Sequence, residues 1–421
     1  MSATVLILGA TGVIGSEIAA QVQAAGYRVR GLARHIPAGK RAVGWIAADA
    51  GRMDAAAWAA ALDGVDVVVN AAGALQDGPR DDLEAVHVTL VRDMVAAIGA
   101  RPVSVVQISA AGVDPDATTV FFRTKAAGDA ILRASGVRHV ILRPGMVLAP
   151  QAYGGTALLR AAAALPGILP VVLPETRIQT VHVADVARAA HAAVRGDVAW
   201  GLTLDLMEEE AHSLPDIIAA MREWLGFPRG SRLTIPAPCV TVGGHVADVA
   251  GWLRWPSPLR TTSLQVLRDG VTGTPSPDFP CRPLATTLAD LPSTAQERRF
   301  ARTWFLLPLA VVTLSLFWIA SGVIALSDPA KAAMVLEDVP GMLARSVVVG
   351  GGIADIALGL AILWRPTARL ACIGMAALSS GYLLGGAMFA PALWLDPLGP
   401  MVKVFPGIVL ALLIAALLEE R

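Results

Sequence analysis

The stretch Thr4-Val-Leu-Ile-Leu-Gly-Ala-Thr-Gly-Val-Ile-Gly15 decides the fold of the N-terminal half of the chain. Its first five residues form a mostly apolar run, which predicts a short buried strand. The residues that follow the glycines predict a helix that runs to Ala25 and ends at Gly26. A glycine-rich turn between a strand and a helix is the context that a dinucleotide-binding site requires.

The three glycines of this turn, Gly9, Gly12 and Gly15, have the spacing G-x-x-G-x-x-G. Gly9 allows the tight turn, Gly12 leaves room for a pyrophosphate, and Gly15 lets the helix lie close to the strand. The N-terminus of the helix offers unpaired N–H groups to the phosphates. The cofactor-binding residues expected here are Gly9, Thr11, Gly12, Val13, Ile14 and Gly15.

Composition narrows the class of protein. The 421 residues carry 34 Lys and Arg and 34 Asp and Glu, so the net charge is zero and no basic stripe predicts a nucleic-acid partner. Hydrophobic residues make up 55% of the chain, and the mean hydropathy of +0.58 exceeds that of ordinary soluble proteins.

The three cysteines form no metal or disulfide pattern and indicate reduced thiols. No signal peptide is recognised, so the N-terminal half is expected in the cytoplasm.

Strand and helix patterns alternate through the first 230 residues. Strands are expected at residues 4–8, 28–33, 44–47, 65–69, 103–108, 137–142, 179–183 and 202–206, with helices between them, one of them at 82–98. This alternation predicts an α/β fold, a doubly wound parallel Rossmann sheet. Residues 1–230 are the expected NAD(P)-binding domain, residues 231–290 a small substrate-side lobe and linker, and residues 301–421 an all-α, four-helix transmembrane domain. Within the lobe, residues 275–292 read as a linker.

Two residues bear on which nucleotide is bound. Arg34 follows the second strand, where an acid would bind the ribose 2′-hydroxyl of NAD and an arginine accommodates the 2′-phosphate of NADP. We therefore expect NADP(H), with NAD(H) left open and a solvated surface arginine as the alternative. Asp49 follows the third strand, where its carboxylate reaches either the adenine amino group or the N-terminus of the next turn.

Small residues follow the fourth strand in Asn70-Ala-Ala-Gly73, and Ser109 follows the fifth. The carboxyl ends of parallel strands meet at one edge of the sheet, where ligands bind. Ala71, Ala72 and Gly73 are therefore expected beside the cofactor.

These motifs, together with Thr124-Lys125, Arg143-Pro-Gly145 and His182-Val-Ala-Asp185, resemble the extended and atypical short-chain dehydrogenase/reductases over roughly residues 1–290. The resemblance implies that Lys125 holds the nicotinamide ribose, that Ser109 donates a hydrogen bond at the reaction centre, and that Pro144 lines the cofactor. It also implies a local hydrogen-bonding role for His182. Asp185 is expected to cap the helix that follows it.

The chain departs from this family four residues before Lys125, where the family has a tyrosine that acts as acid and base. Phe121 stands there and has no proton to give. Of the three tyrosines, only Tyr153 lies on a loop beyond a strand end, so it is the candidate substitute acid. The alternative is that the fold keeps the nucleotide and has lost the chemistry.

Four apolar stretches fill the C-terminal region, at residues 304–326, 346–364, 370–389 and 404–418. The first three are long enough to span a bilayer, and the fourth is short. This pattern of helices resembles the DoxX-like membrane modules. Lys and Arg concentrate before the first stretch and in the second connection, which predicts that both termini are cytoplasmic.

Asp355 lies within the second apolar stretch and needs a hydrogen-bonding partner inside the bundle. Ser379, Ser380 and Tyr382 on the third stretch are the expected partners, and Gly381-x-x-x-Gly385 is the expected site of close helix approach.

The sequence thus predicts an oxidoreductase of the inner membrane of a bacterial-type cell, with a cytoplasmic Rossmann domain that binds NADP(H). Its expected substrate is a small or lipid-soluble molecule such as a quinone. A non-catalytic, nucleotide-bound structural or redox-sensing subunit is the alternative, and an epimerase-type enzyme is a third hypothesis that the missing tyrosine weakens. The substrate itself and the oligomeric state stay open.

Overall fold

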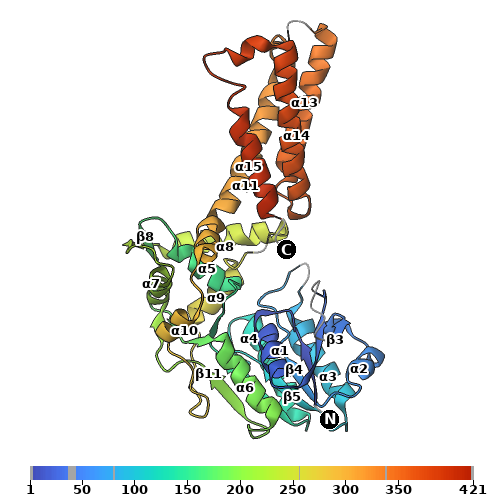
Figure 1. The fold of residues 1–421 in the computed structure, drawn as a ribbon, viewed down its shortest axis with the longest axis vertical. Helices are drawn as coiled ribbons and strands as arrows, with labels where there is room; N and C mark the ends of the chain where they lie inside the picture. The colour runs from blue at the N-terminus through green and yellow to red at the C-terminus, as the bar shows by residue number, and fades with distance from the viewer. Residues whose placement is uncertain (1–2, 37–43, 79–80, 256, 337–338, 419–421) are drawn as a thin grey trace. The chain divides into compact units, whose positions relative to one another are not determined.

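The computed structural model describes residues 3–36, 44–78, 81–255, 257–336 and 339–418. The chain divides into two compact units (Figure 1). The first holds Met1–Asp248 and Pro258–Ala301, and the second holds Val249–Ser257 and Arg302–Arg421. The short segment 249–257 therefore groups with the C-terminal helices, although it lies between two parts of the first unit along the chain.

The first unit is built on a parallel sheet of seven strands in the order β11-β6-β5-β4-β1-β2-β3, which confirms the predicted doubly wound architecture. Its strands are β1 (Thr4–Leu8), β2 (Arg28–Ala33), β3 (Gly44–Ala47), β4 (Val67–Asn70), β5 (Ser104–Ile108), β6 (His139–Pro144) and β11 (Thr203–Leu206). The strand order reverses at β1, between β2 and β4, and in open α/β sheets ligands bind at such a switch point.

Helices cover both faces of the sheet (Figure 1). On one face α1 (Val13–Ala24) packs against α6 (Val183–Arg195), and on the other lie α2 (Ala55–Ala61), α3 (Leu90–Ile98) and α4 (Val120–Ala134). Alternate residues of β1 serve the two cores: Val5 and Ile7 face α1 and α6, whereas Leu6 and Leu8 face the other layer. The apolar run of the first strand is thus buried on both sides, as parallel sheets require.

The helix expected over residues 82–98 begins differently from the prediction. Its first part is a π-helix, η2 (Ala85–Thr89), and only the second part, α3, is α-helical. The widened turn brings the backbone of His87 against α4, where a Cβ on Gly128 would clash with the carbonyl oxygen of His87. A π-helix is an uncommon local distortion and is often found at functional sites.

The rest of the first unit forms a second, smaller core beside the sheet. Helices α5 (Gly154–Ala163), α7 (Leu214–Trp224) and α10 (Leu284–Asp290) contribute buried residues to this core. This part of the chain also holds α9 (Thr261–Asp269) and α8 (Ala237–Trp252), whose last four residues belong to the second unit. Three two-stranded sheets pair β7 (Met146–Leu148) with β10 (Thr180–His182), β8 (Ile168–Val171) with β13 (Ser231–Thr234), and β9 (Arg177–Ile178) with β12 (His212–Ser213). The interpretation of residues 275–292 as a linker is wrong, because Leu284, Leu288 and Leu291 are buried in this core.

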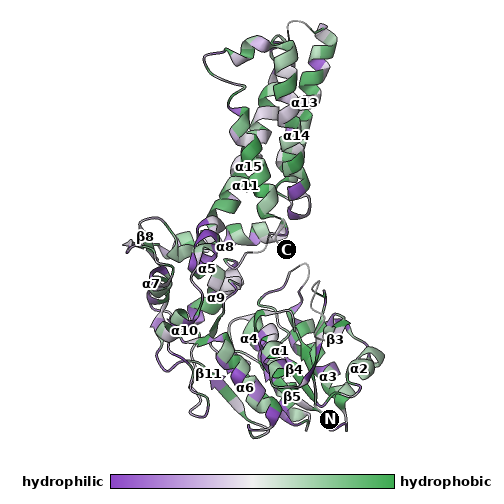
Figure 2. Cartoon of the chain, in the orientation of Figure 1, coloured by the Kyte–Doolittle hydropathy of each residue, from purple (hydrophilic) through white to green (hydrophobic). Residues whose placement is uncertain are grey.

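The second unit consists of apolar helices (Figure 2). Three of them, α11 (Ala295–Ser327), α13 (Gly341–Ala361) and α14 (Arg365–Phe389), are long and apolar enough to cross a membrane. The fourth apolar helix, α15 (Val404–Leu417), is shorter, and α12 (Pro329–Ala333) is a single turn. Many large apolar side chains of these helices are exposed, as lipid-facing residues are.

Helices α11 and α13 approach each other closely at glycines. A Cβ on Gly322 of α11 would clash with the carbonyl oxygen of Gly352, and a Cβ on Gly359 would lie 2.8 Å from Cγ1 of Ile319. Close approach at Gly381 and Gly385 was the wrong prediction, because nothing lies within 4 Å of a Cβ at either position. Small residues do allow a close approach of two helices, but these helices are α11 and α13, and Gly381 and Gly385 of α14 do not take part.

Asp355 is buried inside this unit and bridges three helices. Its Oδ1 accepts a hydrogen bond from the Tyr382 hydroxyl at 2.8 Å, and its Oδ2 accepts one from Ser321 of α11 at 3.0 Å. The predicted partner Tyr382 is confirmed. Ser380 instead donates to the carbonyl oxygen of Ala376, and Ser321 was not foreseen.

Candidate nucleotide-binding site

The glycine turn after β1 has no room for side chains. Gly9 has φ +71°, and a Cβ there would lie 2.8 Å from the carbonyl oxygen of Ala71. At Gly15 a Cβ would clash with the carbonyl oxygen of Gly9, and at Gly12 it would lie 3.2 Å from the same oxygen. The backbone after β1 therefore lies directly against the backbone after β4, which is the close approach that a pyrophosphate-binding turn needs.

Helix α1 starts at this turn with its donors available. Gly12 is the N-cap residue in an extended conformation, and Val13 and Ile14 form the first turn together with Gly15. The first N–H groups of a helix have no partner within it, and no acidic side chain competes for them in this first turn. Thr11 is exposed at the start of the helix. The chain here fits a phosphate group.

Arg34 lies directly after β2 and is half exposed. Its Nη1 is 2.9 Å from Oδ1 of Asp81, an exposed ion pair. Asp49 follows β3 and caps the short helix η1 (Ala50–Arg52), because its Oδ1 accepts a hydrogen bond from the N–H of Gly51 at 3.3 Å. Of the two alternatives for Asp49, the structure shows the capping contact.

The segment after β4 faces the same edge of the sheet. The buried Asn70 donates from Nδ2 to Oε1 of Gln107 at 2.9 Å and accepts from the N–H of Ala72 at 3.2 Å, which fixes the turn. Gly73 follows, and a Cβ there would lie 3.7 Å both from Nζ of Lys125 and from Nε2 of His87. Gly73, Lys125 and His87 therefore converge at one point.

Lys125 projects from α4 into this point and is almost fully buried. Its Nζ donates to the carbonyl oxygen of Ile108 at 3.2 Å and lies 5.8 Å from the centre of the Phe121 ring. Burial lowers the pKa of Lys125 to about 8, and the nearby carboxylate of Asp129 opposes that shift. The site thus holds a buried ammonium group, and the oxygen atoms of a bound ligand would stabilise its charged form.

Ser109 lies at the end of β5 and is buried. Its hydroxyl donates to Oδ2 of Asp129 at 2.7 Å, so its proton is directed into the protein interior. Burial raises the pKa of Asp129, while Ser109, Lys125 and Arg143 oppose the shift. The structure therefore brings Ser109 together with Asp129, one helical turn beyond Lys125 on α4.

His87 is a residue of this site that the sequence did not single out. The N–H of Ala74 donates to its Nε2 at 3.4 Å, so that nitrogen is unprotonated and Nδ1 carries the proton. Nδ1 then donates to the Thr124 hydroxyl at 2.8 Å, which in turn donates to the carbonyl oxygen of Phe121 at 3.2 Å. Burial, with the charge of Lys125, lowers the pKa of His87 to about 2. His87 is a neutral, fixed ring and does not supply a proton.

Phe121 completes this wall of the site. Its ring meets that of His87 edge-on, with 5.6 Å between the ring centres. Tyr153, the candidate substitute acid, precedes α5 and is 67% exposed. No hydrogen bond among the described residues joins its hydroxyl to Lys125 or Ser109. Pro144 ends β6 at the same edge of the sheet, and its carbonyl oxygen accepts from the N–H of Ala111.

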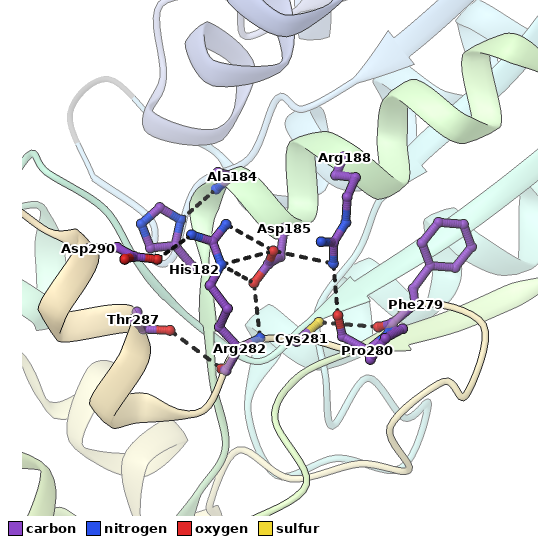
Figure 3. Close-up of polar contacts among 10 residues, drawn as sticks. All are labelled: His182, Ala184, Asp185, Arg188, Phe279, Pro280, Cys281, Arg282, Thr287 and Asp290. Carbon is purple, nitrogen blue, oxygen red and sulfur yellow. Dashed lines mark hydrogen bonds and ion pairs between the residues drawn. The ribbon is translucent and has the colours of Figure 1, made fainter.

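Asp185 and Arg282 tie the end of the first unit to α6 (Figure 3). Arg282 donates to both carboxylate oxygens of the fully buried Asp185, with Nη2 3.0 Å from Oδ1, and from Nη1 to Asp290 at 2.8 Å. Burial alone would raise the pKa of Asp185, but the hydrogen bonds and charge of Arg282 hold it below its usual value. His182, and not Asp185, caps α6, since its Nδ1 accepts from the N–H of Ala184 at 3.0 Å. The expected cap at Asp185 was wrong.

Comparisons with known proteins agree with this division of the chain. The NAD dependent epimerase/dehydratase family matches residues 5–199, and the DoxX-like family matches residues 315–412. The chain therefore joins a Rossmann domain of the extended short-chain dehydrogenase/reductase type to a DoxX-like region, as the sequence motifs predicted. No curated protein matches the chain.

Solved structures share the fold of the first unit. UDP-glucuronic acid 4-epimerase from Bacillus cereus, in complex with NAD, superposes with a TM-score of 0.51 at 16% sequence identity, over 72% of this chain and 99% of that one. MoeE5 in complex with UDP-glucuronic acid and NAD gives a TM-score of 0.51 at 17% identity, with the same coverage. At such identities the likeness concerns the fold.

Proposed function

We propose, from the membership of residues 5–199 in the NAD dependent epimerase/dehydratase family and of residues 315–412 in the DoxX-like family, that the chain is a membrane-tethered oxidoreductase. It binds NADP(H) in the Rossmann domain and passes hydride to a hydrophobic acceptor such as a quinone. The observation that carries the proposal is the buried Lys125 beside Phe121: the cofactor-holding group is kept where the proton-donating phenol is absent.

The residues at the sheet edge have distinct tasks in this proposal. The turn at Gly9–Gly15 and the first N–H groups of α1 hold the pyrophosphate. Lys125 holds the nicotinamide ribose, and Gly73, which has no side chain, lies beside its Nζ. The bound cofactor supplies hydride. A quinone that accepts hydride takes its proton from water, so this reaction needs no acid at position 121.

Arg34 supports NADP(H) over NAD(H). It lies at the end of β2, where the ribose 2′-position is expected, and it forms an exposed ion pair with Asp81. An exposed ion pair contributes about 0–1 kcal/mol, so Arg34 can exchange Asp81 for a phosphate at little cost. Asp49 is then near the adenine while it caps η1.

The membrane unit supports a lipid-soluble substrate. Asp355, Tyr382 and Ser321 form a polar cluster among apolar helices, and ionisable groups at such positions are often functional. Arg298, Arg299 and Arg302 in the first turns of α11, with Arg365 and Arg369 at the start of α14, support a cytoplasmic Rossmann domain, where nicotinamide nucleotides are available.

A second candidate function is a non-catalytic, nucleotide-bound subunit of a membrane complex. Phe121 and the commitment of the Ser109 proton to Asp129 favour it, because neither group can then assist a reaction. An epimerase that acts on a sugar nucleotide, as the solved UDP-glucuronic acid 4-epimerase does, would also fit the family. This chain, however, has Phe121 in place of the phenol that such chemistry uses.

The test uses the full chain purified in detergent. Mass spectrometry of the co-purified nucleotide should find NADP(H), and short-chain quinones should oxidise added NADPH, which is followed by nicotinamide absorbance. Asp355→Leu should keep NADPH binding and lose quinone turnover if the polar cluster serves the acceptor. Bound NADPH that no quinone oxidises would favour the non-catalytic candidate.

A further inference from the structure

Helix α8 carries an apolar stripe on one face. Val242, Val246, Val249 and Trp252 are 60%, 64%, 63% and 81% exposed. Their spacing of three and four residues places them along one side of the helix. The only charged residue of α8 is Asp248, whose carboxylate accepts hydrogen bonds from Arg260 and Thr261 and does not belong to the stripe. Apolar side chains are thus exposed along this face, and the exposed His245 is the polar residue that lies among them.

The opposite face of α8 is fixed against α9. Val240, Gly244 and Ala247 are buried there, and a Cβ on Gly244 would lie 2.9 Å from Cδ1 of Leu264. The Thr261 hydroxyl donates to Asp248 at 2.8 Å. Because this face is packed so closely, α8 cannot rotate to bury the exposed stripe.

The residues that follow α8 are bound to the apolar helices of the second unit. The indole N–H of Trp255 donates to the carbonyl oxygen of Leu363 at 2.7 Å, and the N–H of Arg365 donates to the carbonyl oxygen of Leu253 at 3.1 Å. Leu363 lies in the connection between α13 and α14, where the chain leaves one candidate span and enters the next. The C-terminal end of α8 is therefore held at the connection between two candidate membrane spans.

The side chains at this point are those of a membrane interface. The guanidinium of Arg254 lies 5.5 Å from the centre of the Trp364 ring, and that of Arg365 lies 5.5 Å from the centre of the Trp255 ring. Tryptophan is enriched at the level of lipid headgroups, and arginine there keeps its charge in water while its stem contacts apolar groups.

We propose that α8 is an interfacial helix whose stripe, from Val242 to Trp252, inserts between the lipids of the membrane that α11, α13 and α14 cross. The bilayer is the occupant because the stripe is continuous along the helix with a segment bound at the bilayer surface. Since the stripe has no charge, its insertion depends on apolar burial and needs no anionic lipid. This surface is independent of the acceptor that the Rossmann domain serves.

The test places a probe on the stripe in the full-length protein. The natural thiols are removed by Cys239→Ser, Cys281→Ser and Cys372→Ala, and Val246→Cys carries an environment-sensitive fluorophore. The protein is reconstituted in nanodiscs of phosphatidylcholine, with or without lipids spin-labelled near the headgroup. Retention of NADPH binding shows that the labelled protein is folded.

Two matched positions calibrate the signal. Ala56→Cys lies on an exposed part of α2 in the Rossmann domain, and Ile324→Cys lies on α11, where the side chain is 71% exposed. Val249→Cys repeats the measurement on the stripe. We expect quenching at positions 246 and 249 to exceed that at position 56 by about threefold or more, because the interfacial face lies within the headgroup region.

Three results overturn the proposal. Equal, weak quenching at positions 246, 249 and 56 shows that the stripe faces water. Blue-shifted emission at position 246 without quenching by the spin-labelled lipids shows that protein, and not lipid, covers the helix. Quenching that appears only when phosphatidylglycerol is added contradicts an insertion driven by apolar burial.

Discussion

At the residue scale, the proposed function assigns the choice of nucleotide to Arg34. Arg34→Ala should weaken NADPH binding about tenfold or more and leave NADH binding nearly unchanged, because a charge-assisted hydrogen bond to a phosphate contributes about 1.5–3 kcal/mol. Isothermal titration with both nucleotides measures the two affinities. Arg92→Ala, an exposed arginine of α3 that pairs with the neighbouring Asp93, is the control and should alter neither. Equal affinities of the parent protein for NADPH and NADH contradict the assignment.

Lys125 should make nucleotide binding depend on pH. Its pKa is lowered to about 8 by burial, so the amine is charged below that pH and neutral above it. A charged amine is the better partner for the ribose hydroxyls, and NADPH affinity should therefore fall as the pH rises through about 8. A bound nucleotide that favours the ammonium form moves this transition to higher pH.

The check is a titration of the parent and of Lys125→Met from pH 6.5 to 9.5. The variant should bind NADPH more weakly and lose the alkaline decline, whereas Arg34→Ala should retain it. An alkaline decline of the same size in Lys125→Met would assign the titration to another group.

The sequence predicted the residues of the glycine turn and Lys125 because short local patterns define them. It did not predict His87, whose role depends on Ala74, on Thr124 and on the π-helix that displaces it. Its contact with Thr124 joins residues 37 positions apart, and no periodicity encodes such a contact. Similarly, Ser321 was missed as a partner of Asp355, because a serine in an apolar stretch gives no signal of which helix it faces.

At the scale of elements, the ion pair between Asp185 and Arg282 holds residues 276–290 against α6. Arg282→Ala leaves the buried carboxylate with Arg188 as its remaining ion-pair partner, with Nη2 3.3 Å from Oδ1. Loss of such a partner costs about 2–3 kcal/mol after allowance for the partial exposure of Arg282. Hydrogen exchange in α6 and α10 should therefore be faster in Arg282→Ala than in the parent protein.

The acid dependence of this effect has a definite sign. The folded-state pKa of Asp185 is lowered, so its contribution to stability is present at neutral pH and is lost as the pH falls toward that pKa. The difference in hydrogen exchange between the parent and Arg282→Ala should therefore shrink in acid. Arg195→Ala on the same helix removes an exposed ion pair with Asp197 and should change exchange little. A difference that grows in acid would show that Asp185 is not the group involved.

The elements that the sequence missed share a physical cause. No helix was expected at residues 237–252, which hold Pro238, Gly243 and Gly244, yet α8 forms there and packs closely against α9 at Gly244. Prolines on both sides of α10 likewise suggested a linker. Tertiary packing overrode local propensity in both helices. The parallel strands were predicted well because burial on both faces gives each a continuous apolar run.

At the scale of the whole molecule, we infer the orientation of the helices in the membrane from the distribution of Lys and Arg. We expect four spans, with α15 as a short fourth, and with both termini in the cytoplasm. An alkaline phosphatase fused after Arg421 should be inactive, and a green fluorescent protein at the same position should fluoresce. The reverse pattern would show an odd number of spans and would overturn the assignment of α15.

The most direct test of the account is hydride transfer in the reconstituted protein, with parent and Phe121→Tyr compared side by side. NADPH consumption is followed by nicotinamide absorbance in nanodiscs, with either a short-chain quinone or a simple ketone as acceptor. The parent should oxidise NADPH with the quinone and not with the ketone, because no acid stands beside Lys125, and Phe121→Tyr should gain weak ketone reduction. Ketone reduction by the parent that is lost in Tyr153→Phe would contradict the account and make Tyr153 the proton donor.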